Sequence, residues 1–296
     1  MFKQENKFMD FGFSKIFTEI VSCGNITKAA EKLGYTQSGL SHTLNRAEEE
    51  LGFKLFYRGK KGVSLTPEGK TLLPVAREME QCREKMYETI AAIQGFEKGQ
   101  ITIGTIQSIT INTISPILKA FRHDYPHIKI AFKEGSVQEI HDLILDHSVD
   151  IGFTSLQEDD EFECIPIFND PLLAVVPTDY NSESGYFNVK DFEKYPFIMA
   201  AMEKDNDKDI DRIIKNCSLN LDVIFSSKDD IAIMSMVENG LGISMLPQLI
   251  TLRHFQNIKT LPLNPPASRV LGVGLLSVES ASPATLKFIE YLKKML

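Results

Sequence analysis

The chain has 296 residues, of which 43% are hydrophobic and 24% charged, with a mean hydropathy of −0.10 and a net charge of −8. This length allows two or three domains, and this composition is typical of a soluble globular protein. No apolar run approaches the ~20 residues that cross a bilayer, and the first residues lack the apolar core of a signal peptide. We therefore expect a cytoplasmic protein with no membrane partner.

Charge is unevenly distributed along the chain. Residues 1–66 contain ten Lys and Arg against seven Asp and Glu, a net charge of +3, so the remaining residues carry −11. Contacts with DNA phosphates require such a positive excess. We expect any DNA contact in the N-terminal segment, and none in the acidic remainder.

Three helices are predicted in this basic segment. The first spans residues 10–23, and its inward-facing residues are Phe13, Phe17, Ile20 and Val21. Asn25 caps the second helix, which Gly34 ends. Thr36 or Gln37 opens the third. Spacings of four, three and four residues place its apolar residues on one face, and these are Leu40, Leu44, Ala47 and Leu51.

The opposite face of the third helix is polar and can read base edges in a major groove. An ordinary helical hairpin with a solvated face is the alternative. A following hairpin, residues 53–66, favours DNA binding because its glycine-flanked tip is basic, like a wing that reaches phosphates or the minor groove. The candidate DNA contacts on the two helices and the wing are Thr27, Lys28, Gln37, Ser38, Ser41, His42, Asn45, Arg58, Lys60 and Lys61.

A family resemblance rests on motifs in residues 10–70, which are Ala29–Leu33, Gln37-Ser38, Leu40-Ser41, Glu48–Gly52, Leu55-Phe56, Arg58, Leu65-Thr66 and Gly69. In this order and spacing they resemble the LysR-type transcriptional regulators. The resemblance implies a winged helix-turn-helix, with the polar face of the third helix toward the major groove. His42 and Lys61 stand where relatives often have Arg. This affects which bases are preferred, because Arg and Lys differ in bidentate recognition.

A long helix is predicted from Pro67 to about Phe96, roughly 45 Å at 1.5 Å per residue. Thr66 caps it, and Pro74 should bend it. Its heptad-like seam consists of Leu72, Ala76, Met79, Arg83, Met86, Ile90 and Ile93. A core helix of the same chain is the alternative. We favour pairing between subunits, since a helix this long would outrun a small core, and the resemblance implies a dimer linker.

Strands and helices alternate after Gly99, which predicts parallel sheets with helical crossovers. The expected strands are 101–105, 128–133, 149–153, 172–176, 197–200, 223–225, 242–246 and 270–276. The expected helices are 111–125, 137–146, 210–217, 229–238, 247–254 and 283–296. The last strand and helix return to the first unit, giving crossing connections near Asp170 and Ala267. Tyr125-Pro126 and the segment 237–247 resemble the effector domain of LysR-type regulators, itself similar to periplasmic binding proteins.

The predicted fold class is therefore α/β, with an N-terminal winged helix-turn-helix and a two-lobed, parallel-sheet effector domain joined by a long linker helix. The predicted domains are the DNA-binding domain at residues 1–66, the linker at 67–98 and the effector domain at 99–296. Within the effector domain, lobe I comprises residues 99–169 and 268–296, and lobe II comprises residues 170–267.

Small ligands bind beyond the carboxyl ends of strands in open α/β sheets, where helix amides point outward. The candidate effector-binding residues in those loops are Thr105, Gln107, Ser108, Ser136, Phe153, Thr154, Ala201, Met202, Ser226 and Ser227. Any single hydroxyl can instead be a helix cap. Lys228 favours an anionic ligand and Glu134 opposes it, so the charge of the ligand stays open. No Arg is obviously placed to grip a carboxylate.

Other functional classes have little support in the sequence. Nucleophile-elbow, dinucleotide-binding and phosphate-loop motifs are absent from the chain, so we do not expect an enzyme. We expect no metal and no cofactor, because the acidic runs 158–161 and 205–211 lack calcium-loop spacing. The four scattered cysteines are expected to be free thiols, with a redox pair of Cys164 and Cys217 as the minor alternative.

The sequence thus predicts a LysR-type regulator of transcription, controlled by a small molecule between two α/β lobes. Its expected partners are double-stranded DNA at an interrupted palindrome, the effector, RNA polymerase and further copies of itself. Pairing through the linker would give a dimer, and two dimers a homotetramer. A DNA-binding regulator whose C-terminal domain is a ligand-free assembly module, or a thiol-redox sensor, is the alternative.

Overall fold

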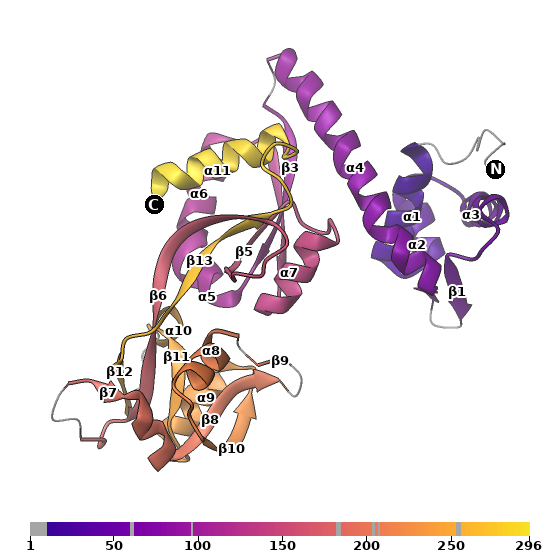
Figure 1. Ribbon diagram of the computed structural model, residues 1–296. Coiled ribbons are helices and arrows are strands. Elements are labelled where there is room, and N and C mark those ends of the chain that lie inside the picture. Colours follow the sequence, from indigo (N-terminus) through magenta and orange to yellow (C-terminus); the bar gives the residue numbers. More distant parts are fainter. Residues whose placement is uncertain are drawn as a thin grey trace.

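The computed structural model describes residues 11–59, 62–95, 97–181, 185–202, 205–206, 208–252 and 256–296 (Figure 1). A helical N-terminal segment is followed by one long helix and then by a larger α/β part, as expected. Lys60 and Lys61, at the wing tip, lie outside the described residues. None of the described helices is long and apolar enough to cross a membrane.

The N-terminal segment contains three helices and one hairpin, which are α1 (Phe11–Cys23), α2 (Ile26–Leu33), α3 (Gln37–Leu51), β1 (Phe56–Gly59) and β2 (Gly62–Leu65). Asn25 and Thr36 cap α2 and α3 through their side chains, and Gly34 and Gly52 end them in the left-handed conformation. Leu40 and Leu44 are fully buried in one core with the apolar residues of α1, so the predicted apolar face of α3 is confirmed.

The long helix α4 spans Pro67–Ile93 and begins at the predicted cap, where the Thr66 hydroxyl accepts a hydrogen bond from the Gly69 amide. Its first turns belong to the core of the N-terminal segment, where Leu73 and Ala76 are buried. The helix ends three residues before the expected Phe96. Only the first part of the predicted seam is used within the described chain, because Met86, Ile90 and Ile93 in the later turns are exposed.

Lobe I begins with parallel strands covered by helices, as in Figure 1. Its elements are β3 (Gly99–Thr105), α5 (Gln107–Ile109), the π-helical turn η1 (Thr110–Ile114), α6 (Ser115–Asp124), β4 (Ile128–Glu134), α7 (Val137–Leu145) and β5 (Ile151–Ser155). The C-terminal helix α11 (Pro283–Met295) returns to this lobe, where Phe288 stacks edge-on against Phe121 in the core.

Lobe II contains a second, smaller sheet in the order β10-β8-β9. Its elements are β7 (Phe187–Asn188), the 3-10 helix η2 (Val189–Lys194), β8 (Pro196–Met202), β9 (Asp205–Asn206), α8 (Lys208–Asn216), β10 (Asp222–Ser227), α9 (Asp230–Glu238), β11 (Ser244–Pro247), α10 (Gln248–Thr251) and β12 (Ile258–Asn264). The cores of the two lobes are separate clusters of buried residues, with Phe192 and Phe197 central to that of lobe II.

The large sheet is mixed, which corrects the prediction of a parallel sheet. Its order is β4-β3-β5-β13-β6-β12-β7, and β13 (Ser268–Leu275) runs antiparallel to both β5 and β6 (Glu163–Pro177). The strand β6 has 15 residues and begins well before the expected start at Leu172. Pro166 and Pro171 argue against a strand there, but Pro166 lies where the register with β13 shifts, and a bulge accommodates proline.

The strands β6 and β13 are the two connections between the lobes. They pair across the predicted lobe boundaries, with Asp170 opposite Arg269. The strand β6 runs through the boundary at 169/170 without a break, and β13 begins at the other boundary, with Ser268. The division at residues 169/170 and 267/268 stays a prediction. The strand β12 has no counterpart among the expected strands, because Pro262 and Pro265 interrupt or follow it in the sequence.

Candidate functional site

The exposed face of α3 carries the predicted polar side chains. Gln37, Ser38 and His42 are exposed, and Ser41 and Asn45 are half-buried. The Gln37 side-chain amide donates a hydrogen bond to the Ser41 hydroxyl (3.2 Å), one turn further along the helix. Thr27 and Lys28, at the start of α2, are exposed as well. These side chains form a row of donors and acceptors on the surface of the N-terminal segment.

The β1–β2 hairpin is fixed to α3 by a buried carboxylate that no local pattern in the sequence singles out. Glu48 is 2% exposed, and its Oε1 accepts hydrogen bonds from the amides of Leu55 (2.8 Å) and Phe56 (3.2 Å). On the surface, the Arg58 guanidinium donates to Asn45 Oδ1 (2.6 Å). Two predicted DNA contacts therefore touch each other, and they join the hairpin to the polar face of α3.

A cavity of about 540 Å³ lies between the lobes. That volume is typical of a small-molecule site. Lobe I lines it with the starts of α5 and α7, and lobe II with the starts of α8, α9 and α10 and the end of β10. The polar and charged residues of the lining are Gln107, Ser108, Glu134, Ser136, Gln138, Glu139, Lys208, Asp211, Ser227, Lys228, Asp230 and Arg269.

The cavity brings together four of the ten predicted effector residues, which are Gln107, Ser108, Ser136 and Ser227. Thr105, Phe153 and Thr154 are at most 1% exposed and lie away from the lining, while Ser226 is exposed on β10. A strand end alone does not tell which way a side chain points, and the structure buries Thr105, Phe153 and Thr154 in the interior of lobe I. Ala201 and Met202 lie in β8, with side chains outside the described part.

An arginine does reach the cavity, contrary to the expectation from the sequence. Arg269 is 3% exposed, and its Nε and Nη2 both donate to Asp170 Oδ2 (3.0 and 2.9 Å). Nη2 also donates to the Ser108 hydroxyl (3.2 Å), and Asp170 Oδ1 accepts from the Leu249 amide (3.0 Å). The Arg269–Asp170 pair thus joins β6 and β13, the two strands that connect the lobes, to the start of α5 and to α10.

A π-helical turn follows this point. In η1 the Asn112 side-chain amide donates to the carbonyls of Ser108 and Leu249, both at 2.9 Å. Ser115 Oγ donates to the Thr110 carbonyl five residues earlier (2.5 Å). Single π turns in otherwise α-helical segments are frequent at functional sites. Here the turn holds the cavity wall of lobe I against α10 of lobe II.

Charges of both signs line the cavity. Lys208, Lys228 and Arg269 are opposed by Glu134, Glu139, Asp211 and Asp230. Glu139 completes a capping box with Ser136, and the backbone and hydroxyl hydrogen bonds from Ser136 hold the pKa of its carboxyl below the usual range. Arg269 is compensated by Asp170. The lining therefore does not select a ligand of one charge.

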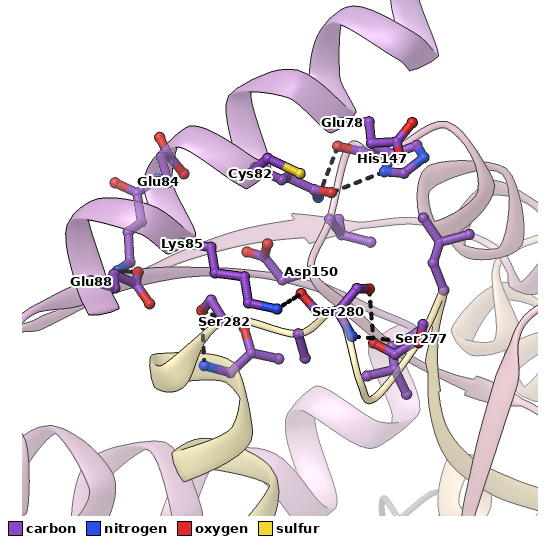
Figure 2. Close-up of a pocket in the computed structure, with 17 residues that line it drawn as sticks. Glu78, Cys82, Glu84, Lys85, Glu88, His147, Asp150, Ser277, Ser280 and Ser282 are labelled. Atoms are coloured by element: carbon purple, nitrogen blue, oxygen red, sulfur yellow. Dashed lines mark hydrogen bonds between the residues drawn. The ribbon is translucent and has the colours of Figure 1, made fainter. Parts of the chain in front are cut away.

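A second, smaller cavity of about 100 Å³ lies where α4 packs on lobe I (Figure 2). Lys85 donates to the carbonyls of Ser280 (2.9 Å) and Glu279 (3.3 Å) on its rim. Asp150 is a half-buried acid in the lining of this cavity, and its Oδ2 accepts a hydrogen bond from the Thr102 amide (2.6 Å). Burial raises the pKa of Asp150 from 3.8 to about 6. Burial likewise raises the pKa of Glu84.

The structure bears on the alternative of a redox pair between Cys164 and Cys217. All four are free in the structure. Burial and the neighbouring Asp160 raise the pKa of Cys164 to about 11, so its thiol is protonated at neutral pH. A protonated thiol is a poor nucleophile, which weighs against a redox role for this residue. Cys217 packs against the core of lobe II.

Two family models match the chain. One, described as LysR substrate binding domain, matches residues 94–296, and the other, described as bacterial regulatory helix-turn-helix protein of the lysR family, matches residues 14–70. The uncharacterized HTH-type transcriptional regulator YvbU of Bacillus subtilis is 27% identical over 285 residues, which cover 95% of this chain and 97% of that protein. The probable HTH-type transcriptional regulator LrrA of Synechococcus elongatus is 25% identical, covering 95% of each chain.

Solved structures share the fold along almost the whole chain. A full-length OxyR variant from Pseudomonas aeruginosa superposes with a TM-score of 0.75 at 19% identity, covering 97% of both chains. HinK, a LysR family transcriptional regulator from the same species, gives a TM-score of 0.60 at 22% identity, covering 97% of this chain and 98% of its own. The chain therefore belongs to the LysR-type family of DNA-binding transcriptional regulators, which are not enzymes.

Proposed function

We propose that this regulator is controlled by a small-molecule effector that binds in the cavity between the lobes. The observation that carries the proposal is the cavity itself, since its 540 Å³ are lined from both lobes by convergent polar groups. The effector contacts are Gln107, Ser108, Ser136 and Ser227, with Lys228 and Arg269 added from the lining. A ligand that touches both lobes stabilises one relative orientation of them, by no more than its difference in affinity for the two states.

The proposed DNA contacts are the row on α3 and the hairpin. Gln37, Ser38, Ser41 and His42 face base edges of the major groove, while Thr27, Lys28 and Arg58 approach the backbone. Asn45 holds Arg58 through its side-chain oxygen and so orients it. Lys60 and Lys61 are proposed as further DNA contacts of the wing, because the sequence places them between β1 and β2. The net charge of +3 on residues 1–66 supports this assignment.

The proposed dimer contact is the later part of α4. Four large side chains there are between 43% and 80% exposed, which are Met86, Tyr87, Ile90 and Ile93. Exposed apolar patches of this kind mark protein–protein contacts. Pairing of two such helices would bring two DNA-binding segments onto an interrupted palindrome. Assembly of two dimers through the effector domains would give the tetramer, and contact with RNA polymerase would transmit the effect to transcription.

Selection of bound sites from genomic DNA fragments with the purified protein tests the DNA part. An enriched interrupted palindrome is the expected result, and no enrichment at moderate salt would overturn the assignment. The genes beside the enriched sites narrow the choice of effector.

Thermal denaturation against a metabolite library tests the cavity. A true effector raises the melting temperature as its concentration exceeds the dissociation constant. The rise should disappear in Ser108→Ala with Ser136→Ala and persist in the control Ser226→Ala, which lies outside the lining. A C-terminal domain that serves only assembly predicts no stabilising compound at all.

A further inference from the structure

Helix α7 lies between the two cavities, and each of its ends holds a different partner. Its first turn, residues 136–139, lines the large cavity. The capping box fixes this turn, because the Ser136 amide donates to Glu139 Oε2 (2.8 Å) and the Glu139 amide donates to the Ser136 hydroxyl (3.2 Å). A ligand in the cavity would therefore press on a rigid helix start rather than on a flexible loop.

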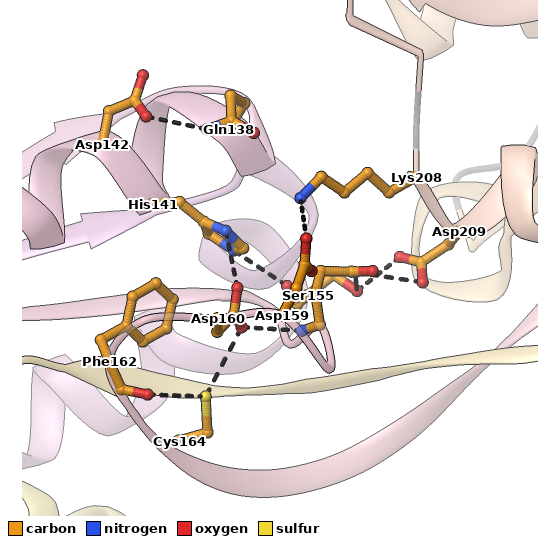
Figure 3. A network of polar contacts seen from close by, with 11 residues as sticks. Gln138, His141, Asp142, Ser155, Asp159, Asp160, Phe162, Cys164, Lys208 and Asp209 are labelled. Carbon is orange, nitrogen blue, oxygen red and sulfur yellow. Dashed lines mark hydrogen bonds and ion pairs between the residues drawn. The ribbon is translucent and has the colours of Figure 1, made fainter.

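In the middle of α7, the buried side chain of His141 ties the helix to the segment that follows β5 (Figure 3). Both ring nitrogens of His141 have oxygen partners, since Nδ1 lies 3.1 Å from Asp160 Oδ1 and Nε2 lies 3.2 Å from the Ser155 carbonyl. The hydroxyl of Ser155 in turn donates to Asp209 Oδ2 on α8 of lobe II (2.6 Å). A shift of lobe II thus reaches α7 through hydrogen bonds as well as through the cavity wall.

The far end of α7 holds the linker helix. Arg77 Nη1 of α4 donates to Asp146 Oδ2 (2.6 Å) and to the Asp146 carbonyl (3.2 Å). One turn further along α4, Gln81 makes two contacts with His147 (Figure 2). Gln81 Oε1 lies 2.9 Å from the ring Nδ1, and Gln81 Nε2 donates to the His147 carbonyl (3.3 Å). Arg77 and Gln81 of α4, with Asp146 and His147 at the end of α7, form the contact that we call the α7–α4 latch.

The latch includes a strained residue. His147 has φ of +57°, a conformation that a non-glycine residue adopts at a cost. The Asp146 carboxylate supports this turn by accepting the Ser148 amide (2.9 Å) while it binds Arg77. Strained residues that their surroundings hold in place cluster at switch regions. Here the strain presents both the ring and the carbonyl of His147 to one glutamine of the linker.

We infer that α7 couples the large cavity to the linker helix, so that a change at either end alters the other. The inference rests on the proposed function and names its route of regulation. Occupation of the cavity moves the first turn of α7, the latch passes this movement to α4, and α4 carries the DNA-binding segment. Coupling between two sites is reciprocal, so DNA binding must also change the first turn of α7.

This reciprocity allows a test with DNA as the only probe. Hydrogen exchange of the full-length protein is measured with and without a saturating duplex that the wild type binds in the selection experiment. In the wild type we expect exchange in the peptide that covers residues 136–139 to change by about fivefold or more on DNA binding, the lower end of typical coupling strengths. In Arg77→Met with Gln81→Ala we expect this change to disappear.

Lys85→Met is the matched control. Lys85 also ties α4 to lobe I, but to the carbonyls of residues 279 and 280 and not to α7. It should weaken docking of α4 while keeping the response of residues 136–139. Asp146→Asn is a milder variant that opens the latch from the other side and should reduce the response if the double variant does not fold.

The outcomes separate this inference from the proposed function. A wild type that binds the duplex without any change in residues 136–139 overturns the inference alone, as does an equal response in the latch variants. Loss of the response in Lys85→Met to the same degree would mean that docking of α4 in general carries the coupling, which also overturns it. If the site selection enriches no DNA, that result counts against the proposed function. It is obtained before the hydrogen-exchange experiment, so the two failures can be told apart.

Discussion

The DNA-binding segment and the effector domain assemble their functional residues over different distances along the chain. Gln37, Ser41 and Asn45 stand one turn apart on a single helix, so their common face is set by local periodicity. In the effector domain, Arg269 meets Asp170 across 99 residues and Ser108 across 161. Local patterns therefore define the first surface, and only the folded chain defines the second.

The largest effect should come from the long-range pair. Asp170→Ala leaves the buried Arg269 guanidinium without its carboxylate, and breaking such a pair on one side costs about 3–5 kcal/mol. We expect a correspondingly lower stability in thermal or urea denaturation. Asp170→Ala with Arg269→Met should be more stable than the single variant, since no charge then stays uncompensated. A double variant as unstable as Asp170→Ala would contradict this account.

Replacing Asp150 should raise the stability of the fold rather than lower it. Its pKa lies at about 6 in the folded protein against 3.8 for an unperturbed group, so the folded state binds the proton more tightly. Stability therefore falls as the pH rises between these values, and the charged acid destabilises the fold at pH 7. Asp150→Asn can still accept from the Thr102 amide, and we expect it to add about 2–3 kcal/mol at pH 7.

The pH profile of unfolding checks this prediction. The gain from Asp150→Asn should vanish below about pH 4, where both the folded and the unfolded acid are protonated. Parallel profiles for the wild type and the variant would show that another group is responsible.

Glu48 tests whether the hairpin depends on α3. Glu48→Ala leaves the amides of Leu55 and Phe56 without their acceptor, and an unsatisfied buried group costs about 1–3 kcal/mol. We expect lower stability of the DNA-binding segment and weaker DNA binding in the same variant. Glu49→Ala, an exposed neighbour, is the control and should change neither.

Sequence preference should depend on the exposed row of α3. Ser41→Ala with His42→Ala should reduce discrimination between the selected site and a scrambled one by about 1–3 kcal/mol for each base that is no longer recognised. Competition binding measures this ratio. An unchanged ratio, with binding intact, would mean that base edges are read elsewhere.

The smallest effect is expected from the wing. Arg58→Met should lower the slope of log affinity against log salt by about 0.9, the contribution of one phosphate. Because Arg58 also donates to Asn45, the variant Asn45→Ala should show a part of this change if that contact orients the guanidinium. A slope that stays the same in Arg58→Met would remove Arg58 from the phosphate contacts.

The sequence by itself determined the elements whose signals are local. The caps at Asn25, Thr36 and Thr66 and the apolar face of α3 follow from neighbouring residues, and all of them are present in the structure. The helices that periodicity predicts in the effector domain are also present, with ends shifted by a few residues, whereas η2 was not predicted. The family followed from motifs of the same local kind.

Only the tertiary structure decided what depends on distant partners. The antiparallel course of β6 and β13, the Arg269–Asp170 pair and the α7–α4 latch all join segments far apart in the sequence. Prolines hid the first part of β6 and the whole of β12, because a strand tolerates proline only at a bulge or an unpaired edge, which pairing decides. Ser108 and Ser136 reach the cavity from the helix starts that follow strand ends, while Phe153 and Thr154 are buried inside lobe I.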